Sequence, residues 1–208
     1  RAHAYMNRQY LDPALKGSYP DELAEVFGEA WPEWPAEDLK DICQPVDFIG
    51  INYYTRNVVQ ADPNQWPLGA SPVRQNATHT TTDWEVYPPA LTDMLVWFRD
   101  TYGDIPVYIT ENGAAFYDPP KAGPDGIDDP LRCDYLRTHI SAIGDAIKQG
   151  VDVRGYMAWS LLDNLEWSLG FSKRFGIVHV DYETQVRTPK RSARFYSSVI
   201  AANGGNLG

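Results

Sequence analysis

Three short apolar runs, each followed by a segment of helical pattern, dominate the sequence of this chain. The runs lie at 46–52, 107–111 and 153–159 and are rich in β-branched and aromatic residues. The helical patterns lie at 88–98, at 131–149 and from 189 to about 202. Parallel strands need a long crossover between them, so strands that alternate with helices are typical of a parallel sheet or barrel. The pattern predicts an α/β fold with three parallel strands.

The remaining segments are predicted as shorter helices, loops and one hairpin. A helix over residues 1–10 should be broken by the following Pro13, Gly17 and Pro20, because proline removes a backbone donor and glycine is typical of helix ends. The other expected elements are short helices at 21–28 and 36–43, loops at 60–83 and 118–130, a hairpin over 175–187 and a frayed tail at 203–208. With 208 residues, the whole chain fits one domain.

The charge balance narrows the class of partner. The formal net charge is -10, and hydrophobic residues make up 43% of the chain. Nucleic acid and anionic membranes attract basic surfaces, so we expect neither as a partner. No apolar run approaches the roughly 18 residues of a membrane span, and the first residues do not resemble a signal peptide.

Cysteine and histidine are too sparse and too scattered for a disulfide framework or a metal site. Cys43 and Cys133 are far apart, and no close pairing relates the four histidines. We therefore expect two free buried thiols, a reducing, cytoplasmic location, and neither a metal nor another cofactor.

Glu111 ends the second apolar run and directly precedes Asn112 and Gly113. A carboxylate at the end of a buried strand is costly unless it is paired or hydrogen-bonded. It has two interpretations. Glu111 either caps the turn formed by the next two residues, or lies at the carboxyl mouth of a barrel, where barrel enzymes keep their catalytic groups.

Polar or aromatic groups also end the other two runs. Asn52 to Tyr54 follow the first run, and Trp159 closes the third. Parallel strands end on one face, so these groups should meet Glu111 in a common pocket. Glu166 beside Trp167 adds a carboxylate and an indole, which together suit the hydroxyls and the apolar face of a sugar.

These segments resemble a known family. The motifs DFIGINYY at 47–54, WEVYP at 84–88, VYITENG at 107–113 and the stretch from 159 to 181 are closely similar to retaining β-glucosidases of glycoside hydrolase family 1, and RTPKRSA at 187–193 extends the similarity. The similarity runs over essentially the whole chain. It implies a (β/α)₈ TIM barrel that hydrolyses β-glucosides or cello-oligosaccharides with retention of configuration.

The resemblance also implies a role for each candidate residue. Glu111 would be the catalytic nucleophile, and Tyr54 would donate a hydrogen bond that favours the ionised form of that carboxylate. The implied substrate-binding residues are Trp159 as the floor of the sugar site, Glu166 and Trp167 as hydroxyl partners, Phe175 as a wall, Trp84 on the leaving-group side and Asn52 as a hydrogen-bonding neighbour. Tyr54, Phe175 and Trp159 could instead be ordinary core aromatics.

The residues near the third strand favour an unphosphorylated sugar. Family members that act on 6-phosphorylated sugars typically have small residues in place of Glu166 and Trp167 and recruit a Lys and a Tyr. This chain has Lys173, but it keeps both residues and has Phe175 where the Tyr would stand. A carboxylate repels a phosphate, so a plain β-glucoside is the expected substrate.

One half of the implied machinery is not found in these residues. A retaining glycosidase needs a second carboxylate as acid/base, which the family carries in a Thr-Asn-Glu-Pro type sequence that does not occur here. Only three of eight barrel strands are predicted. We therefore expect a C-terminal portion of the barrel, about strands 6 to 8 with their helices. Exposed strand edges would make it unstable alone, so it should need an N-terminal complement, as a separate chain or a nicked half.

Two alternatives differ in class from an enzyme of this kind. The chain could be a non-catalytic carbohydrate-binding or regulatory fragment that keeps the sugar clamp. A doubly wound nucleotide-binding domain is weakened, because no strand is followed by a Gly-x-Gly-x-x-Gly turn.

Overall fold

The computed structural model describes residues 1–119, 122–123 and 126–207. The contacts within the chain divide the protein into two compact units. The first comprises Arg1–Asp47 and Asn57–Gln75, and the second comprises Phe48–Arg56 and Asn76–Gly208. The second unit contains the three predicted strands and all the candidate site residues.

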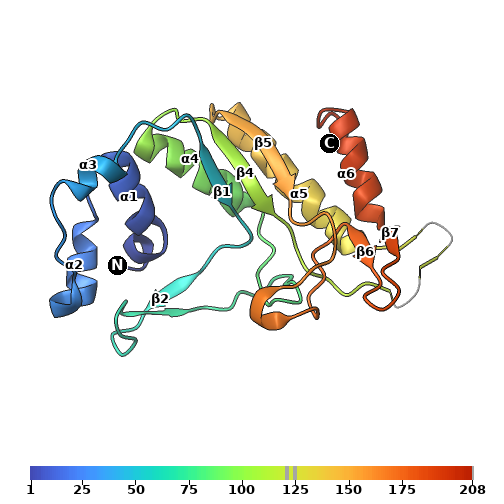
Figure 1. Ribbon diagram of the computed structural model, residues 1–208, viewed down its shortest axis with the longest axis horizontal. Helices are drawn as coiled ribbons and strands as arrows, with labels where there is room; N and C mark the ends of the chain where they lie inside the picture. The colour runs from blue at the N-terminus through green and yellow to red at the C-terminus, as the bar shows by residue number, and fades with distance from the viewer. Residues whose placement is uncertain (120–121, 124–125, 208) are drawn as a thin grey trace. The chain divides into compact units, whose positions relative to one another are not determined.

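A parallel three-stranded sheet forms the centre of the second unit. Its strands are β1 (Ile49–Asn52), β4 (Val107–Asn112) and β5 (Val153–Ala158), in the order β1-β4-β5. The intervening helices are α4 (Pro89–Tyr102) and α5 (Pro130–Lys148), and α6 (Arg191–Ala201) follows later. Figure 1 shows α4 and α5 along one face of this sheet. The predicted strand and helix alternation is confirmed.

The core of this unit lies between the sheet and its helices. Leu91, Leu95 and Phe98 recur at helical spacing along α4 and are fully buried, as are Val107 and Ile109 of β4. Trp97, which the pattern also placed on the apolar face, is only partly buried. Burial of an apolar side chain of this size contributes about 1.5–3 kcal/mol, so this layer supplies much of the unit's stability.

The opposite side of the sheet is largely uncovered in this chain. Phe48 and Met157 are 53% and 47% exposed, and Gly50 and Asn52 of β1 are exposed as well. All-parallel sheets occur almost only with both faces covered. The chain therefore presents a sheet surface of the kind that another layer normally covers.

The first unit is mostly helical. It contains the π-helix η1 (Ala4–Arg8), α1 (Gln9–Lys16), α2 (Asp21–Phe27), the 3₁₀-helix η2 (Gly28–Ala30) and α3 (Asp38–Ile42). Among the expected helix breakers, Pro13 is wrong: it lies inside α1, where a proline can remove one hydrogen bond without ending the helix. Gly17 ends α1 as expected, with a left-handed φ of 69°.

The predicted loop over 60–83 is also partly wrong. Strands β2 (Val59–Ala61) and β3 (Ala70–Pro72) form an antiparallel hairpin in the first unit. Each strand has three residues, and nearly all are exposed or only half-buried, so no apolar alternation marks them. Cys43, expected to be buried, is half-buried at the end of α3, whereas Cys133 is buried as expected; both thiols are free.

The predicted hairpin near the carboxyl end is confirmed. Strands β6 (Val178–Val180) and β7 (Arg187–Pro189) pair antiparallel, and the 3₁₀-helix η3 (Trp167–Leu169) precedes them. Of the predicted loop 118–130, residues 120–121 and 124–125 lie outside the described residues. At the start of the predicted tail, the backbone amides of Asn203 and Gly204 donate hydrogen bonds to the carbonyls of Ile200 and Val199 in α6. The last residue of the tail, Gly208, lies outside the described residues.

Among the described residues, no helix combines the length and the apolar character needed to cross a membrane.

Candidate active site

The Glu111 carboxylate at the end of β4 accepts a short hydrogen bond from Tyr54. The distance from the Tyr54 hydroxyl to Glu111 Oε2 is 2.6 Å, at the short end for an O–H···O hydrogen bond. The two residues are 57 positions apart, and strand pairing brings them together: Asn52 of β1 is opposite Glu111, and the Tyr53 amide donates to the Glu111 carbonyl at 2.9 Å. The carboxylate is therefore held by a specific partner and does not simply cap a turn.

The protonation state of Tyr54 suits it to be the donor. Burial raises the pKa of its phenol well above the usual value, and the hydrogen bond to Glu111 and the charges of Glu111 and Glu166 raise it further. A phenol that stays protonated keeps its O–H available to the Glu111 carboxylate.

Glu166 shares the electrostatic environment of Glu111. Its pKa is raised, first by burial and then by the negative charge of Glu111. The negative charge of Glu111 thus acts on Glu166, although the two residues are 55 positions apart in the sequence.

Three predicted site aromatics contact one another beside Glu111. The ring centroids of Tyr54 and Trp84 are 5.1 Å apart, and Phe175 lies 6.0 Å from Tyr54 and 5.9 Å from Trp84. The next residue after Trp84, Glu85, accepts two hydrogen bonds from the Arg56 guanidinium at 2.9 and 3.0 Å. Together these rings form an aromatic wall next to the carboxylate, which suits the apolar face of a sugar.

Trp159 is placed at the same mouth through the backbone. Its amide donates to the Asn112 carbonyl at 2.9 Å, and the peptide bond from Trp159 to Ser160 is cis. A Cβ on Gly113 would lie only 1.8 Å from the Trp159 carbonyl oxygen. The glycine after Asn112 is therefore required by this close approach of two backbones, rather than by a simple turn.

Two predicted residues are less directly engaged. Asn52 is exposed, and its Oδ1 accepts a hydrogen bond from the Thr110 hydroxyl at 2.7 Å rather than contacting Glu111. Trp167 follows Glu166 at the start of η3 and is 86% exposed. Its ring thus lies open to solvent, while Trp159, Trp84 and Phe175 are at least half-buried.

The sequence patterns did not reveal a buried ion cluster that supports the loop carrying Glu166. The Lys190 ammonium lies 2.9 Å from Asp163 Oδ1 and 2.7 Å from Asp118 Oδ2, and the Arg174 guanidinium lies 2.7 Å from Asp163 Oδ2. Asp163 also accepts the backbone amide of Gly176 at 3.0 Å. Asp163 and Lys190 have fully buried side chains, so this ion cluster ties the loop after β5 to the final hairpin and to α6.

A second part of the ion cluster is centred on Arg132 of α5. Arg132 lies 3.2 Å from Asp118 and pairs with Asp129, and it donates to the Ala114 carbonyl at 3.2 Å. The Asp129 carboxylate accepts bonds from the backbone and hydroxyl of Ser192. Charged residues are seldom buried without partners, but a sequence does not show which charges will pair. The only indication of this region in the sequence was the family similarity at 187–193.

Asp118, Asp163 and His179 carry ligand atoms within 4.8 Å of one another, a spacing that a metal ion could use. The Lys190 ammonium already bonds both carboxylates. A divalent cation would therefore have to compete with a resident positive charge, and the cluster fits an ion-pair network better than a metal centre.

His139 is fully buried in α5, and its burial should make the stability of the protein depend on pH. Burial lowers its pKa from about 6.5 to about 4, and the Nδ1 hydrogen bond to the Tyr135 carbonyl only partly opposes this. The unfolded chain therefore takes up the proton at higher pH than the folded chain. The free energy of unfolding therefore has its full value above about pH 6.5. It falls by about 3 kcal/mol in total as the pH drops toward 4, because the unfolded chain is protonated first.

Urea unfolding from pH 7 to pH 5 would measure this contribution in the wild-type protein and in His139→Gln. The variant should lose less stability over this range, because it has no titrating group at this position. Equal slopes in the two proteins would contradict the prediction.

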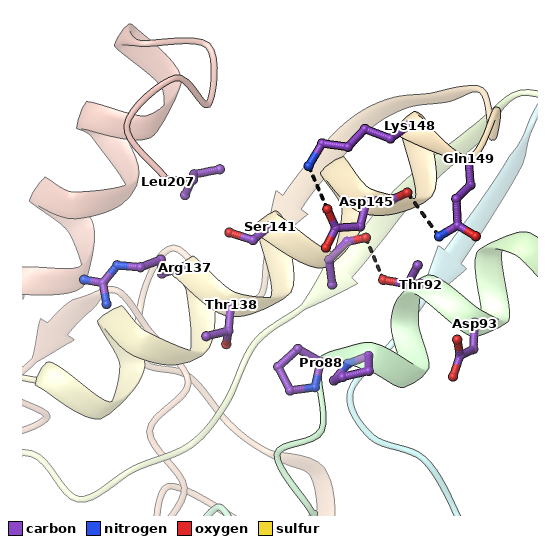
Figure 2. A pocket seen from close by; sticks show the side chains of 12 residues that line it. Pro88, Thr92, Asp93, Arg137, Thr138, Ser141, Asp145, Lys148, Gln149 and Leu207 are labelled. Carbon is purple, nitrogen blue, oxygen red and sulfur yellow. Dashed lines mark hydrogen bonds and ion pairs between the residues drawn. The ribbon is translucent and has the colours of Figure 1, made fainter.

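Two cavities lie elsewhere in the second unit. One of about 720 Å³ is lined by α4, α5 and Leu207, and Figure 2 shows the exposed Lys148–Asp145 pair at its edge. Another of about 260 Å³ is lined by Phe116, Arg174 and neighbouring residues. Neither cavity is lined by Glu111 or Tyr54.

The fold and the site define a carbohydrate-active enzyme class: the chain belongs to glycosyl hydrolase family 1, which residues 1–205 match.

Curated relatives and solved structures agree with this membership. The chain is 45% identical over 195 residues to the 1,4-beta-D-glucan glucohydrolase of Thermotoga neapolitana and 44% identical over 212 residues to the bifunctional beta-D-glucosidase/beta-D-fucosidase of Bifidobacterium breve; each match covers 94% of this chain. Its fold matches the Thermotoga maritima beta-glucosidase in complex with deoxynojirimycin with a TM-score of 0.91, at 42% identity over 97% of this chain.

The chain spans less than half of the proteins it matches. It covers 44% and 46% of the two relatives and 45% of the Thermotoga maritima structure. The family predicted from the motifs is confirmed, and the fold corresponds to part of a family 1 β-glucosidase barrel.

Proposed function

We propose that this chain is the nucleophile-bearing C-terminal part of a retaining β-glucosidase, corresponding to about strands 6 to 8 of a (β/α)₈ barrel. An N-terminal complement would supply the remaining strands and the acid/base carboxylate. The Tyr54–Glu111 hydrogen bond of 2.6 Å, at the carboxyl end of a parallel strand, is the observation that supports this function best. The uncovered face of the sheet is where the complement would pack.

Hydrolysis would proceed in two displacements at the anomeric carbon. In the first, Glu111 attacks that carbon while the bond to the glycosidic oxygen breaks, and the acid/base carboxyl group of the complement protonates the leaving oxygen. In the second, the same group takes a proton from water, which attacks the anomeric carbon and releases Glu111. Two inversions give overall retention. The hydrogen bond from Tyr54 keeps the nucleophile oriented before the first step.

The substrate we propose is an unphosphorylated β-glucoside or a cello-oligosaccharide. Glu166 would accept hydrogen bonds from sugar hydroxyls with Trp167 beside it, Trp159 would lie under the ring, and Phe175 and Trp84 would form the wall. Lys173 donates to the Thr81 carbonyl at 2.5 Å, so its ammonium already has a protein partner. A phosphate at this corner would face the carboxylates of Glu166 and Glu111.

Covalent labelling at Glu111 tests the function directly. The test uses the assembled enzyme, meaning this chain together with an N-terminal complement; the part of Thermotoga maritima beta-glucosidase A that this chain does not match can serve. With a 2-deoxy-2-fluoro-β-glucosyl fluoride, peptide mass spectrometry should find the sugar on Glu111, and activity on an aryl β-glucoside should be lost in parallel.

The alternative of a carbohydrate-binding fragment predicts a different outcome. In that case the assembled chains would bind glucose, seen as a change in tryptophan fluorescence, without label or turnover. Labelling of another carboxylate would contradict the assignment of Glu111.

A further inference from the structure

The side chain of Asn112 joins all three strands directly beneath the candidate nucleophile. It is fully buried, and its amide group donates to the Tyr53 carbonyl at 2.7 Å and to the Tyr135 hydroxyl at 3.1 Å. Its Oδ1 accepts the hydroxyl of Tyr156, on β5, at 2.8 Å. The residue next to Glu111 thus ties β4 to the end of β1, to β5 and to helix α5.

Tyr135 extends this network to Tyr54. Its hydroxyl accepts from Asn112 and donates to the main-chain carbonyl of Tyr54 at 3.0 Å. Its ring is 1% exposed and stacks on His139, with centroids 3.8 Å apart and an interplanar angle of 21°. The phenol therefore projects from a rigid helix, and the backbone it holds is that of the residue whose side chain bonds Glu111.

We propose that Tyr135 is a positioning residue, which sets the orientation of the Tyr54 phenol on Glu111 through the Tyr54 main-chain carbonyl. This inference rests on the proposed function. Without the Tyr135 hydroxyl, the Tyr54 carbonyl and one proton of the Asn112 amide lose their partner in a buried site. The segment that ends β1 is then free to shift, and a misplacement of about 1 Å at the reacting groups can reduce a rate by about a hundredfold.

Tyr135→Phe in the assembled enzyme tests this role. We expect kcat on an aryl β-glucoside to fall about tenfold, with KM changed by less than about twofold, because the sugar contacts remain while the nucleophile is misaligned. The rate constant for inactivation by the 2-fluoro glucosyl fluoride should fall by the same factor.

Tyr196→Phe is the matched control. The Tyr196 hydroxyl also donates to a main-chain carbonyl, that of Tyr156, at 3.0 Å, but it lies on α6 and holds the middle of β5. This variant should lose comparable stability and keep the wild-type kcat. A kcat within twofold of wild type for Tyr135→Phe, or an equal fall in both variants, would overturn the proposal.

A double-mutant cycle with Tyr54→Phe separates positioning from general structural support. If Tyr135 acts through Tyr54, then Tyr135→Phe lowers kcat in the wild type but has little further effect once the Tyr54 hydroxyl is gone. Additive losses would contradict the proposal. Should Tyr135→Phe not accumulate as a folded protein, Tyr156→Phe frees Asn112 from β5 but keeps the Tyr135 bond to the Tyr54 carbonyl, so kcat should stay within about twofold of wild type. A tenfold fall in that variant would assign the positioning to Asn112 and overturn the proposal.

Failure of the positioning role is distinguishable from failure of the proposed function. If the wild-type assembled enzyme is labelled on Glu111 but Tyr135→Phe reacts at the wild-type rate, only the positioning role is wrong. If Glu111 is not labelled in the wild type, the proposed function is wrong, and the positioning role with it.

Discussion

Replacement of Glu111 by Gln in the assembled enzyme should lower kcat on an aryl β-glucoside by about four orders of magnitude or more. An amide of the same shape keeps a hydrogen-bonding oxygen near the Tyr54 hydroxyl but cannot form the glycosyl ester. Steady-state rates measured by release of the aryl alcohol, with thermal unfolding to confirm the fold, would give the effect.

Chemical rescue identifies the role of the missing carboxylate. In Glu111→Gly, added azide should enter the space of the lost side chain, attack the anomeric carbon and give the α-glucosyl azide, which proton NMR distinguishes from the β-anomer. Glu183→Gln is the control, because Glu183 is an exposed acid in the turn between β6 and β7 and should leave the rate unchanged. A β-azide, or a Glu111→Gln variant that keeps more than about a hundredth of the wild-type rate, would show that Glu111 is not the nucleophile.

Asp163→Asn should lower the free energy of unfolding of the assembled enzyme by about 3–5 kcal/mol, the loss expected when one partner of a buried ion pair is removed. The Lys190 ammonium is fully buried between Asp163 and Asp118, and Arg174 bonds the other Asp163 oxygen. Neutralising Asp163 leaves these cations with too little negative charge nearby. Urea unfolding at pH 7 would measure the change.

Asp145→Asn is the matched surface control. Asp145 pairs with Lys148 at 2.8 Å, but both side chains are more than half exposed, so the urea midpoint should hardly move. Asp163→Asn with Lys190→Met should recover part of the loss, because the double change removes the buried charge along with its partner. Equal effects of the two single variants would show that burial of the ion cluster does not matter for stability.

The strands and helices could be predicted where their burial pattern is regular. The runs that became β4 and β5 are continuous and apolar, and α5 carries a long amphipathic pattern, so local sequence was sufficient. The β2–β3 hairpin was missed because its short strands bury little apolar surface and follow turn-forming residues. Pro13 was expected to break the first helix but lies inside α1, because helix propensity is a weak guide where packing stabilises the helix.

The candidate site was partly predictable for a similar reason. Strand ends can be read from the sequence, and parallel strands end on one face, so Glu111, Trp159 and the residues after β1 were expected to meet. The partners that hold them were not expected. Asn112 was read as part of a turn, and Tyr135 as one position in an amphipathic helix, yet both have buried polar groups that are satisfied across the strands.

By itself, the sequence determined that this is an α/β chain of family 1 type, with a carboxylate at the end of its central strand and aromatic side chains at the neighbouring strand ends. Only the tertiary structure decided which groups meet. Tyr54 contacts Glu111 across 57 residues at the end of the β1–β4 pairing, whose register shifts after Ile51, and Asp163 meets Lys190 across 27 residues inside the core. The physical reason is that periodicity reports local conformation and burial, whereas a hydrogen bond depends on strand register and packing to within a few tenths of an ångström.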